Sequence, residues 1–151
     1  HDKLAILGGD LLVEAVEKIS DGTAPRIPQE DAKATYVKIL NKNMGIIDFN
    51  KPAIEIERLI RGLNPWPSAF TYLGKKTLKL WKASVEAVNI DGKPGEVIEV
   101  RKDALLVLTG KDALLIHELQ LEGKKRLLAE EFLRGNSIAL GTILGDETEA
   151  K

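Results

Sequence analysis

The side chains with the clearest chemical potential are lysines and arginines at predicted turns. Gly74-Lys75-Lys76 and Gly123-Lys124-Lys125 are turn-type sequences with adjacent cations, and Arg134-Gly135-Asn136 exposes a guanidinium near a third turn. Lysine on a flexible stem contacts phosphate groups without reading base sequence. These residue types favour binding of a nucleic-acid backbone. The candidate contacts are Lys42, Lys75, Lys76, Lys124, Lys125, Arg126, Arg134 and Asn136.

No residue pattern indicates a catalytic centre or a metal site. His117 lies in a strand-like run without a second ligand or an acid–base partner nearby, so we expect it to be structural. The chain has no cysteine, no two-histidine zinc spacing, no glycine-rich phosphate loop and no Gly-x-Ser-x-Gly. We therefore predict no catalytic residue, no metal and no cofactor in this segment.

Trp81 has two interpretations. Because Lys79 and Lys82 flank it, the ring could stack on a base. Its place in the apolar alternation of residues 77–88 instead favours the core, and we expect it there. That alternation slips by one residue near Trp81, which predicts a β-bulge.

Composition and charge are those of an ordinary globular protein. The chain is 44% hydrophobic and 30% charged, with a net charge of −1, which argues against a dedicated nucleic-acid binder. Residues 75–82, however, hold four lysines and no acid. No apolar run is long enough to cross a membrane, and no secretory leader is visible. We expect a cytoplasmic protein that contacts neither membrane nor DNA, and since the first residue is His1, a piece of a longer one.

Two helices are predicted before residue 68. Residues 3–20 carry an apolar stripe at helical spacing, and the stripe needs a partner surface. Residues 51–61 follow Asn50, a natural N-cap, with Pro52 in the first turn. Between them, residues 22–50 read as an extended linker.

Asn64-Pro65-Trp66-Pro67 is predicted to form a rigid elbow after the second helix. Each proline fixes its own φ and disfavours helix at the residue before it. We expect the elbow to hold a packed Trp66.

Beyond the elbow the pattern becomes that of strands. We predict strands at 70–73, 77–88, 96–100, 104–109, 113–121 and 137–144, with a short helix at 127–133. The fold class is therefore mainly β with flanking helices, a small barrel of the oligonucleotide-binding (OB) kind. The expected domains are a terminal helix (1–21), a linker (22–50), the barrel with its leading helix (51–145) and an acidic tail (146–151).

An ordered set of short motifs resembles the C-terminal part of methionyl-tRNA formyltransferases. The set is Asn64-Pro65-Trp66-Pro67, Gly74-Lys75-Lys76, Thr109-Gly110, Glu118-Leu119-Gln120, Gly123-Lys124-Lys125 and Phe132-Leu133-Arg134-Gly135. The resemblance implies that residues 1–21 are the last helix of a catalytic domain that lies outside this sequence. It also implies that the parent enzyme moves a formyl group from 10-formyltetrahydrofolate to methionyl-initiator-tRNA, while this segment holds tRNA.

Two alternatives stay open. The segment could be a scaffold that packs against its own catalytic domain and binds no RNA. It could also be the matching domain of a formyltransferase that acts on nucleotide sugars, although the Glu-Leu-Gln and Gly-Lys-Lys pair argues against that reading.

Overall fold

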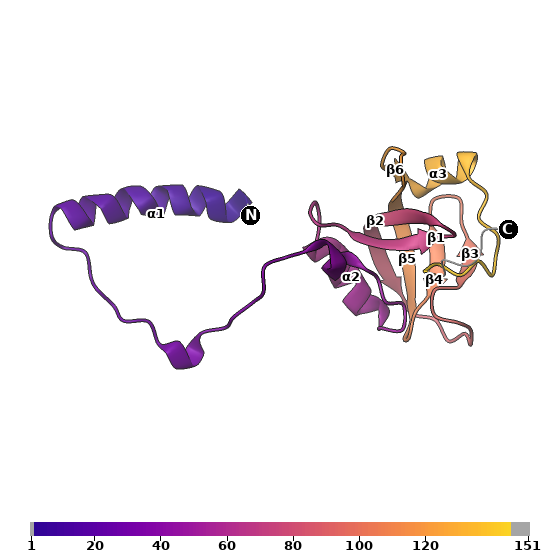
Figure 1. The fold of residues 1–151 in the computed structure, drawn as a ribbon, viewed down its shortest axis with the longest axis horizontal. Helices are drawn as coiled ribbons and strands as arrows, with labels where there is room; N and C mark the ends of the chain where they lie inside the picture. The colour runs from indigo at the N-terminus through magenta and orange to yellow at the C-terminus, as the bar shows by residue number, and fades with distance from the viewer. Residues whose placement is uncertain (1, 146–151) are drawn as a thin grey trace. The chain divides into compact units, whose positions relative to one another are not determined.

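A computed structural model of the chain describes residues 2–145, and the predicted acidic tail at 146–151 lies outside them. The chain divides into two compact units, and the boundary along the sequence lies between Lys38 and Ile39. The first unit contains the helix α1 (Asp2–Ser20) and the short 3₁₀ helix η1 (Asp31–Lys33) (Figure 1). The predicted helix at 3–20 is thus confirmed. No helix among the described residues is long and apolar enough to cross a membrane.

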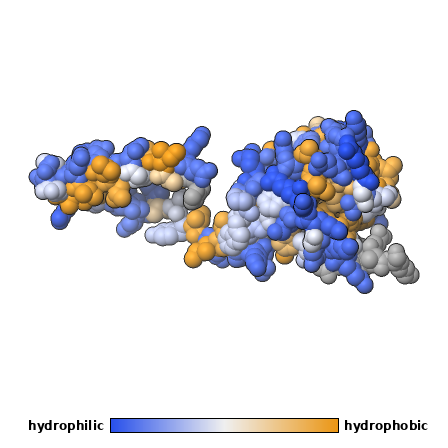
Figure 2. All heavy atoms as spheres, turned by 90° about the horizontal axis from the view of Figure 1, so that it is seen from above, coloured by the Kyte–Doolittle hydropathy of each residue, from blue (hydrophilic) through white to orange (hydrophobic). Residues whose placement is uncertain are grey.

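The apolar stripe of α1 buries none of its residues. Its large side chains are all more than half exposed, and Figure 2 shows apolar atoms at the helix surface. The segment after η1 is similar, with Tyr36 and Val37 each more than 90% exposed. The first unit therefore has no core of its own.

The second unit is built on one antiparallel sheet (Figure 1). Its strand order is β1-β2-β5-β4-β3, and β6 pairs with β5 beside that path. A hydrophobic core of leucine, isoleucine, valine and phenylalanine side chains fills one face of the sheet. The strands are β1 (Ala69–Leu73), β2 (Lys76–Glu86), β3 (Val97–Val100), β4 (Leu105–Leu108), β5 (Ala113–Leu121) and β6 (Leu127–Leu128).

The sheet does not close into a barrel. The two edge strands, β1 and β3, do not pair with each other, and no further strand among the described residues joins them. The predicted strand at 137–144 is wrong. This segment makes one isolated β-bridge, between Ile143 and Glu96. Gly141 and Gly145 have positive φ, which turns the chain out of an extended ladder. The Gly145 N–H nevertheless donates to the Tyr72 carbonyl of β1, and the Leu144 N–H donates to Gly95 just before β3. The segment therefore spans the gap with backbone hydrogen bonds to residues 95–97 on one side and one hydrogen bond to Tyr72 on the other.

Helix α2 (Ala53–Gly62) confirms the second predicted helix and packs against β2 and β5 through Ile56 and Ile60. The expected N-cap at Asn50 is wrong. Its side chain donates to Asp48 Oδ1 (2.8 Å) instead, and the helix begins after Pro52 without a side-chain cap. The segment just before α2 also belongs to the sheet unit, because Ile47 and Phe49 are buried in the core. Donation from the Asn50 side chain and backbone lowers the pKa of Asp48.

The short third helix begins later than predicted. α3 spans Ala129–Gly135, while Leu127 and Leu128 form β6 because they pair with Leu119 and Glu118 of β5. Ala129 and Phe132 bury the inner face of α3. The helix therefore lies beside β5 and β6 (Figure 1).

The elbow does not hold a packed tryptophan. Trp66 is 57% exposed, and both X–Pro bonds of the elbow are cis. Asn64 instead connects the elbow to the sheet: its Nδ2 donates to the Trp81 carbonyl of β2 (3.4 Å).

Candidate nucleic-acid interface

The two lysine-bearing turns lie next to each other at one end of the sheet. β1 and β2 meet at the first turn, and β5 runs antiparallel to β2 and ends at the second. The Glu122 N–H donates to the Thr77 carbonyl (2.8 Å), and the Thr77 N–H donates to Glu122 Oε2 (3.1 Å). The structure thereby brings together four exposed cations that are far apart in sequence: Lys75, Lys76, Lys124 and Lys125.

Trp81 lies on the outer face of the sheet, in contact with further cations. The expectation that it lies in the core is wrong, since its ring is only half-buried and the guanidinium of Arg126 lies 4.9 Å from the ring centre. Lys79 Nζ lies 5.8 Å from the same ring. The ring therefore carries two cations, an arrangement favoured by the negative face of the aromatic system.

Two compensating irregularities in the β2–β5 pairing flank the outward-facing Trp81. The predicted bulge is confirmed: Leu80 pairs with Leu119 and Lys82 pairs with Glu118, so Trp81 is an extra residue in β2. One step later Ala83 pairs with Ile116, which makes His117 the extra residue of β5. Leu78, Leu80 and Ala83 keep their places against the core because the second irregularity restores the register.

Three of the candidate residues lie away from the two turns in the sequence and on other elements. Lys42 opens the 3₁₀ helix η2 (Lys42–Gly45) and is exposed. Arg134 lies on α3, where it pairs with Glu130 (2.7 Å). Asn136 follows α3, and its Nδ2 donates to the Phe132 carbonyl (2.9 Å), so one of its amide donors serves the helix end.

Glu118 and Gln120 contact the second lysine-bearing turn and the arginine that follows it, although no role for them was predicted. Arg126 donates to Glu118, and Gln120 donates to the backbone of Lys124. In the sequence, the motif Glu118-Leu119-Gln120 contributes only to the family resemblance. A strand alternation that places both polar side chains on the face opposite buried Leu119 was the available signal.

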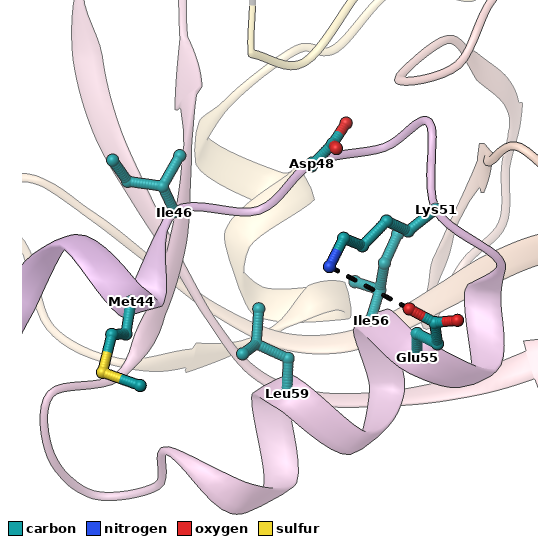
Figure 3. A pocket seen from close by; sticks show the side chains of 7 residues that line it. All are labelled: Met44, Ile46, Asp48, Lys51, Glu55, Ile56 and Leu59. Atoms are coloured by element: carbon teal, nitrogen blue, oxygen red, sulfur yellow. Dashed lines mark ion pairs between the residues drawn. The ribbon is translucent and has the colours of Figure 1, made fainter. Parts of the chain in front are cut away.

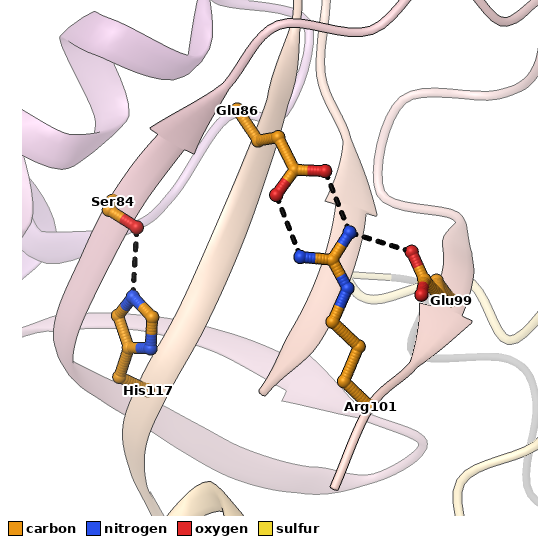
Figure 4. A network of polar contacts seen from close by, with 5 residues as sticks. All are labelled: Ser84, Glu86, Glu99, Arg101 and His117. Atoms are coloured by element: carbon orange, nitrogen blue, oxygen red, sulfur yellow. Dashed lines mark hydrogen bonds and ion pairs between the residues drawn. The ribbon is translucent and has the colours of Figure 1, made fainter. Parts of the chain in front are cut away.

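An ion-pair network centred on Arg101 connects the end of β2 with β3 (Figure 4). Arg101 donates to both oxygens of Glu86 (2.7 and 2.8 Å) and to Glu99 (2.8 Å). These hydrogen bonds lower the pKa of both carboxyl groups and raise the pKa of Arg101. The network joins the end of β2 to β3.

Ser84 Oγ lies 2.8 Å from Nε2 of His117, within hydrogen-bonding distance (Figure 4). Within residues 2–145 no carboxylate is hydrogen-bonded to the other ring nitrogen, so the pair lacks the third member of a catalytic triad. The same residues contain no cluster of His, Asp and Glu that could hold a metal ion.

A small hollow of about 140 Å³ lies between α2 and the segment before it (Figure 3). Met44, Ile46 and Leu59 give it apolar walls, and Lys51 pairs with Glu55 at its edge (4.0 Å). Its volume is too small for a folate-sized molecule, since small-molecule pockets usually measure roughly 300–1,000 Å³.

Comparison with known proteins identifies the relatives of this chain. Residues 39–137 match the family described as formyl transferase, C-terminal domain. The methionyl-tRNA formyltransferase of Lachnospira eligens is 47% identical in an alignment 150 residues long, which covers 96% of this chain and 48% of that protein. That of Alkaliphilus oremlandii is 42% identical over 146 residues, 97% of this chain and 47% of the relative. The chain spans about half the length of the curated relatives it matches.

Solved structures share the fold. HypX from Aquifex aeolicus superposes with a TM-score of 0.60 at 22% identity, over 85% of this chain and 24% of that one. A second structure of HypX, in complex with tetrahydrofolic acid, gives a TM-score of 0.59 at 21% identity, over 88% and 26% of the two chains. The antiparallel sheet with its flanking helices is thus a fold found in larger proteins. With a family match over most of its length and relatives above 40% identity, the chain belongs to the formyl transferase C-terminal domain family.

Proposed function

We propose that this chain is the tRNA-holding, C-terminal part of an enzyme that formylates methionyl-initiator-tRNA in the cytoplasm, for translation initiation. The relatives named methionyl-tRNA formyltransferase support this proposal. 10-Formyltetrahydrofolate is the proposed formyl donor of the whole enzyme, and the tetrahydrofolic acid found with HypX is consistent with a folate.

The observation that carries the proposal is the meeting of two lysine-bearing turns beside an exposed aromatic residue. Lys75, Lys76, Lys124, Lys125 and Arg126 form one basic surface, which we call the basic end, and Trp81 lies next to it. Clustered cations on one face bind a phosphate backbone, even where the net charge of the chain is near zero. Lys42, Arg134 and Asn136 are proposed as outlying contacts to the same tRNA.

The catalytic step belongs to the part of the enzyme that this chain does not span. Its described residues hold no catalytic triad and no metal cluster, so we expect no formyl transfer by the isolated chain. The exposed stripe of α1 is the proposed contact with the N-terminal catalytic domain, because an apolar helix face of this size needs a cover.

A salt series on tRNA binding tests the proposal. Log affinity should fall with log salt by roughly 0.7–0.9 for each phosphate neutralised. The double variant Lys124→Ala/Lys125→Ala should bind more weakly, with a slope that is shallower by roughly one to two units. Folding should be unchanged within about 0.5 kcal/mol, since the lysines are exposed.

A matched control is the double variant Lys93→Ala/Lys111→Ala, which removes the same charge from two exposed loop positions elsewhere. It should keep the slope of the parent. Equal slopes for both double variants would mean that the second turn does not touch the tRNA backbone. No binding by the parent at low salt would contradict the proposal and favour a scaffold that contacts only protein.

A further inference from the structure

The Glu118-Leu119-Gln120 motif of β5 has no role in the proposed function as stated so far. Leu119 is fully buried in the core, while the side chains of Glu118 and Gln120 lie on the opposite, outer face. Both reach the segment 123–126, which carries the basic residues of the second turn.

Gln120 holds the backbone of that segment. Its Nε2 donates to the carbonyl oxygen of Lys124 (2.8 Å), while its Oε1 accepts from Nε1 of Trp81 (3.2 Å). The Lys124 N–H also donates to the Leu121 carbonyl (2.9 Å). Both main-chain polar groups of Lys124 are therefore hydrogen-bonded, and Trp81 fixes the side-chain amide of Gln120 that makes one of these bonds.

Glu118 and Trp81 hold the side chain of Arg126. Nε of Arg126 donates to Oε2 of Glu118 (2.6 Å), and a terminal nitrogen donates to the same oxygen. The guanidinium lies over the Trp81 ring, 4.9 Å from its centre. A guanidinium has five N–H donors, and within residues 2–145 the others have no partner. They remain free for an incoming anion.

We propose that residues 123–126 form a preset phosphate-binding loop, in which Arg126 contacts the RNA backbone and Trp81, Glu118 and Gln120 are its positioning residues. The inference rests on the proposed tRNA binding and deepens it. An arginine held in one orientation loses less conformational freedom on binding than a free one. Its planar fork then meets a phosphate in a defined geometry.

A carboxylate beside a phosphate-binding arginine also repels the ligand, so charge and position must be separated by experiment. Glu118→Gln and Glu118→Ala remove the same charge, but only glutamine keeps an oxygen at the place where Oε2 accepts both bonds. The difference between these two variants of the full chain reports position alone. Glu99→Gln and Glu99→Ala form a control pair, because Glu99 also accepts from an arginine but lies on β3.

The probe is labelled tRNA, titrated at several salt concentrations. We expect Glu118→Ala to bind roughly two- to tenfold more weakly than Glu118→Gln, the loss expected for one side chain that must be ordered on binding. The slope of log affinity against log salt should be shallower for Glu118→Ala than for Glu118→Gln by roughly one unit. The two Glu99 variants should bind equally.

A second measurement reads the position of Arg126 without RNA. The Nε–H of Arg126 should give a slowly exchanging NMR signal in the parent and in Glu118→Gln, and should lose it in Glu118→Ala. Thermal unfolding of each variant separates loss of the loop from loss of the fold.

Equal tRNA affinity of the two Glu118 variants, with both folded and the parent binding, would overturn the preset loop and leave the proposed function standing. Failure of the parent to bind tRNA would instead overturn both. An unprotected Arg126 signal in the parent would also contradict the inference, whatever the affinities are.

Discussion

The helices α1 and α2 are both amphipathic, but α2 buries its apolar face whereas α1 leaves its apolar face exposed. Ile56 and Ile60 of α2 are at most 2% exposed, whereas Leu7, Leu11 and Val16 of α1 are more than half exposed. The stripe of α2 packs on β2 and β5, whereas the described residues of the first unit include no strand. A periodic apolar pattern therefore predicts a helix and its apolar face, but it does not predict the surface against which that face packs.

The same contrast holds for the glycines. A Cβ added to Gly9 of α1 would meet nothing within 4 Å, while a Cβ added to Gly110 would overlap the carbonyl oxygen of Asn50. Gly110 lies where the segment before α2 crosses the β4–β5 turn, and its N–H donates to the Phe49 carbonyl (2.8 Å). Close backbone approach is thus a property of the second unit.

The largest expected effect comes from the core side of α2. Ile56→Ala should destabilise the second unit by about 2–5 kcal/mol, because it removes a buried side chain and leaves a cavity. Leu11→Ala in α1 should leave that unit unchanged. Urea unfolding followed by tryptophan fluorescence measures this directly, since Trp66 and Trp81 are the only tryptophans and both lie in the second unit. Similar losses from both variants would mean that α1 contributes to the same core.

A smaller loss is expected at the crossing of two backbones. Gly110→Ala should cost the second unit about 1–3 kcal/mol, because the backbone of Asn50 must move to admit a methyl group. Gly9→Ala is the matched change in an open position, and it should favour α1 by about 1 kcal/mol without altering the fluorescence-detected transition. Circular dichroism reads α1 and fluorescence reads the second unit. A stable Gly110→Ala variant would show that the two segments do not approach this closely.

The smallest effect concerns pH. Arg101 lowers the pKa of Glu86 in the folded state, so this pair stabilises the second unit above the unfolded pKa of about 4.3. That contribution disappears as the pH falls through the lower, folded pKa.

Glu86→Gln should therefore lower the urea midpoint slightly at pH 7, and the gap to the parent should close as the solution becomes acidic. Glu14→Gln breaks an equivalent bond to Lys18 in α1 and should leave the fluorescence midpoint unchanged. A gap that persists at the lowest pH would argue against the ion pair as its cause.

Local patterns predicted most of the fold. The helices at 3–20 and 51–61, the bulge at Trp81 and the positions of five strands along the chain follow from spacing, turn residues and one phase slip. The last strand failed because Gly141 and Gly145 turn a β-like sequence away from a continuous ladder. Trp81 was expected in the core because the phase slip was placed before it, which groups it with Ala83 and Val85. The structure makes Trp81 itself the extra residue, and its ring lies on the outer face.

The candidate site was predictable as residue types but not as an arrangement. Lys75, Lys76, Lys124 and Lys125 were named from turn sequences, and only the β2–β5 pairing brings the two turns together. The contacts of Glu118 and Gln120 with the second turn depend on which strand face each side chain takes, and on β6 returning beside β5. Such contacts are tertiary, so no local pattern contains them.

We propose that the second unit holds RNA at its basic end, while α1 does not contact RNA. The most direct test is an NMR titration of the isotope-labelled chain with tRNA. We predict that amide signals of residues 74–76 and 120–126 shift or broaden first and that those of residues 3–20 stay unchanged. Changes confined to residues 3–20, with the two turns unaffected, would contradict the account.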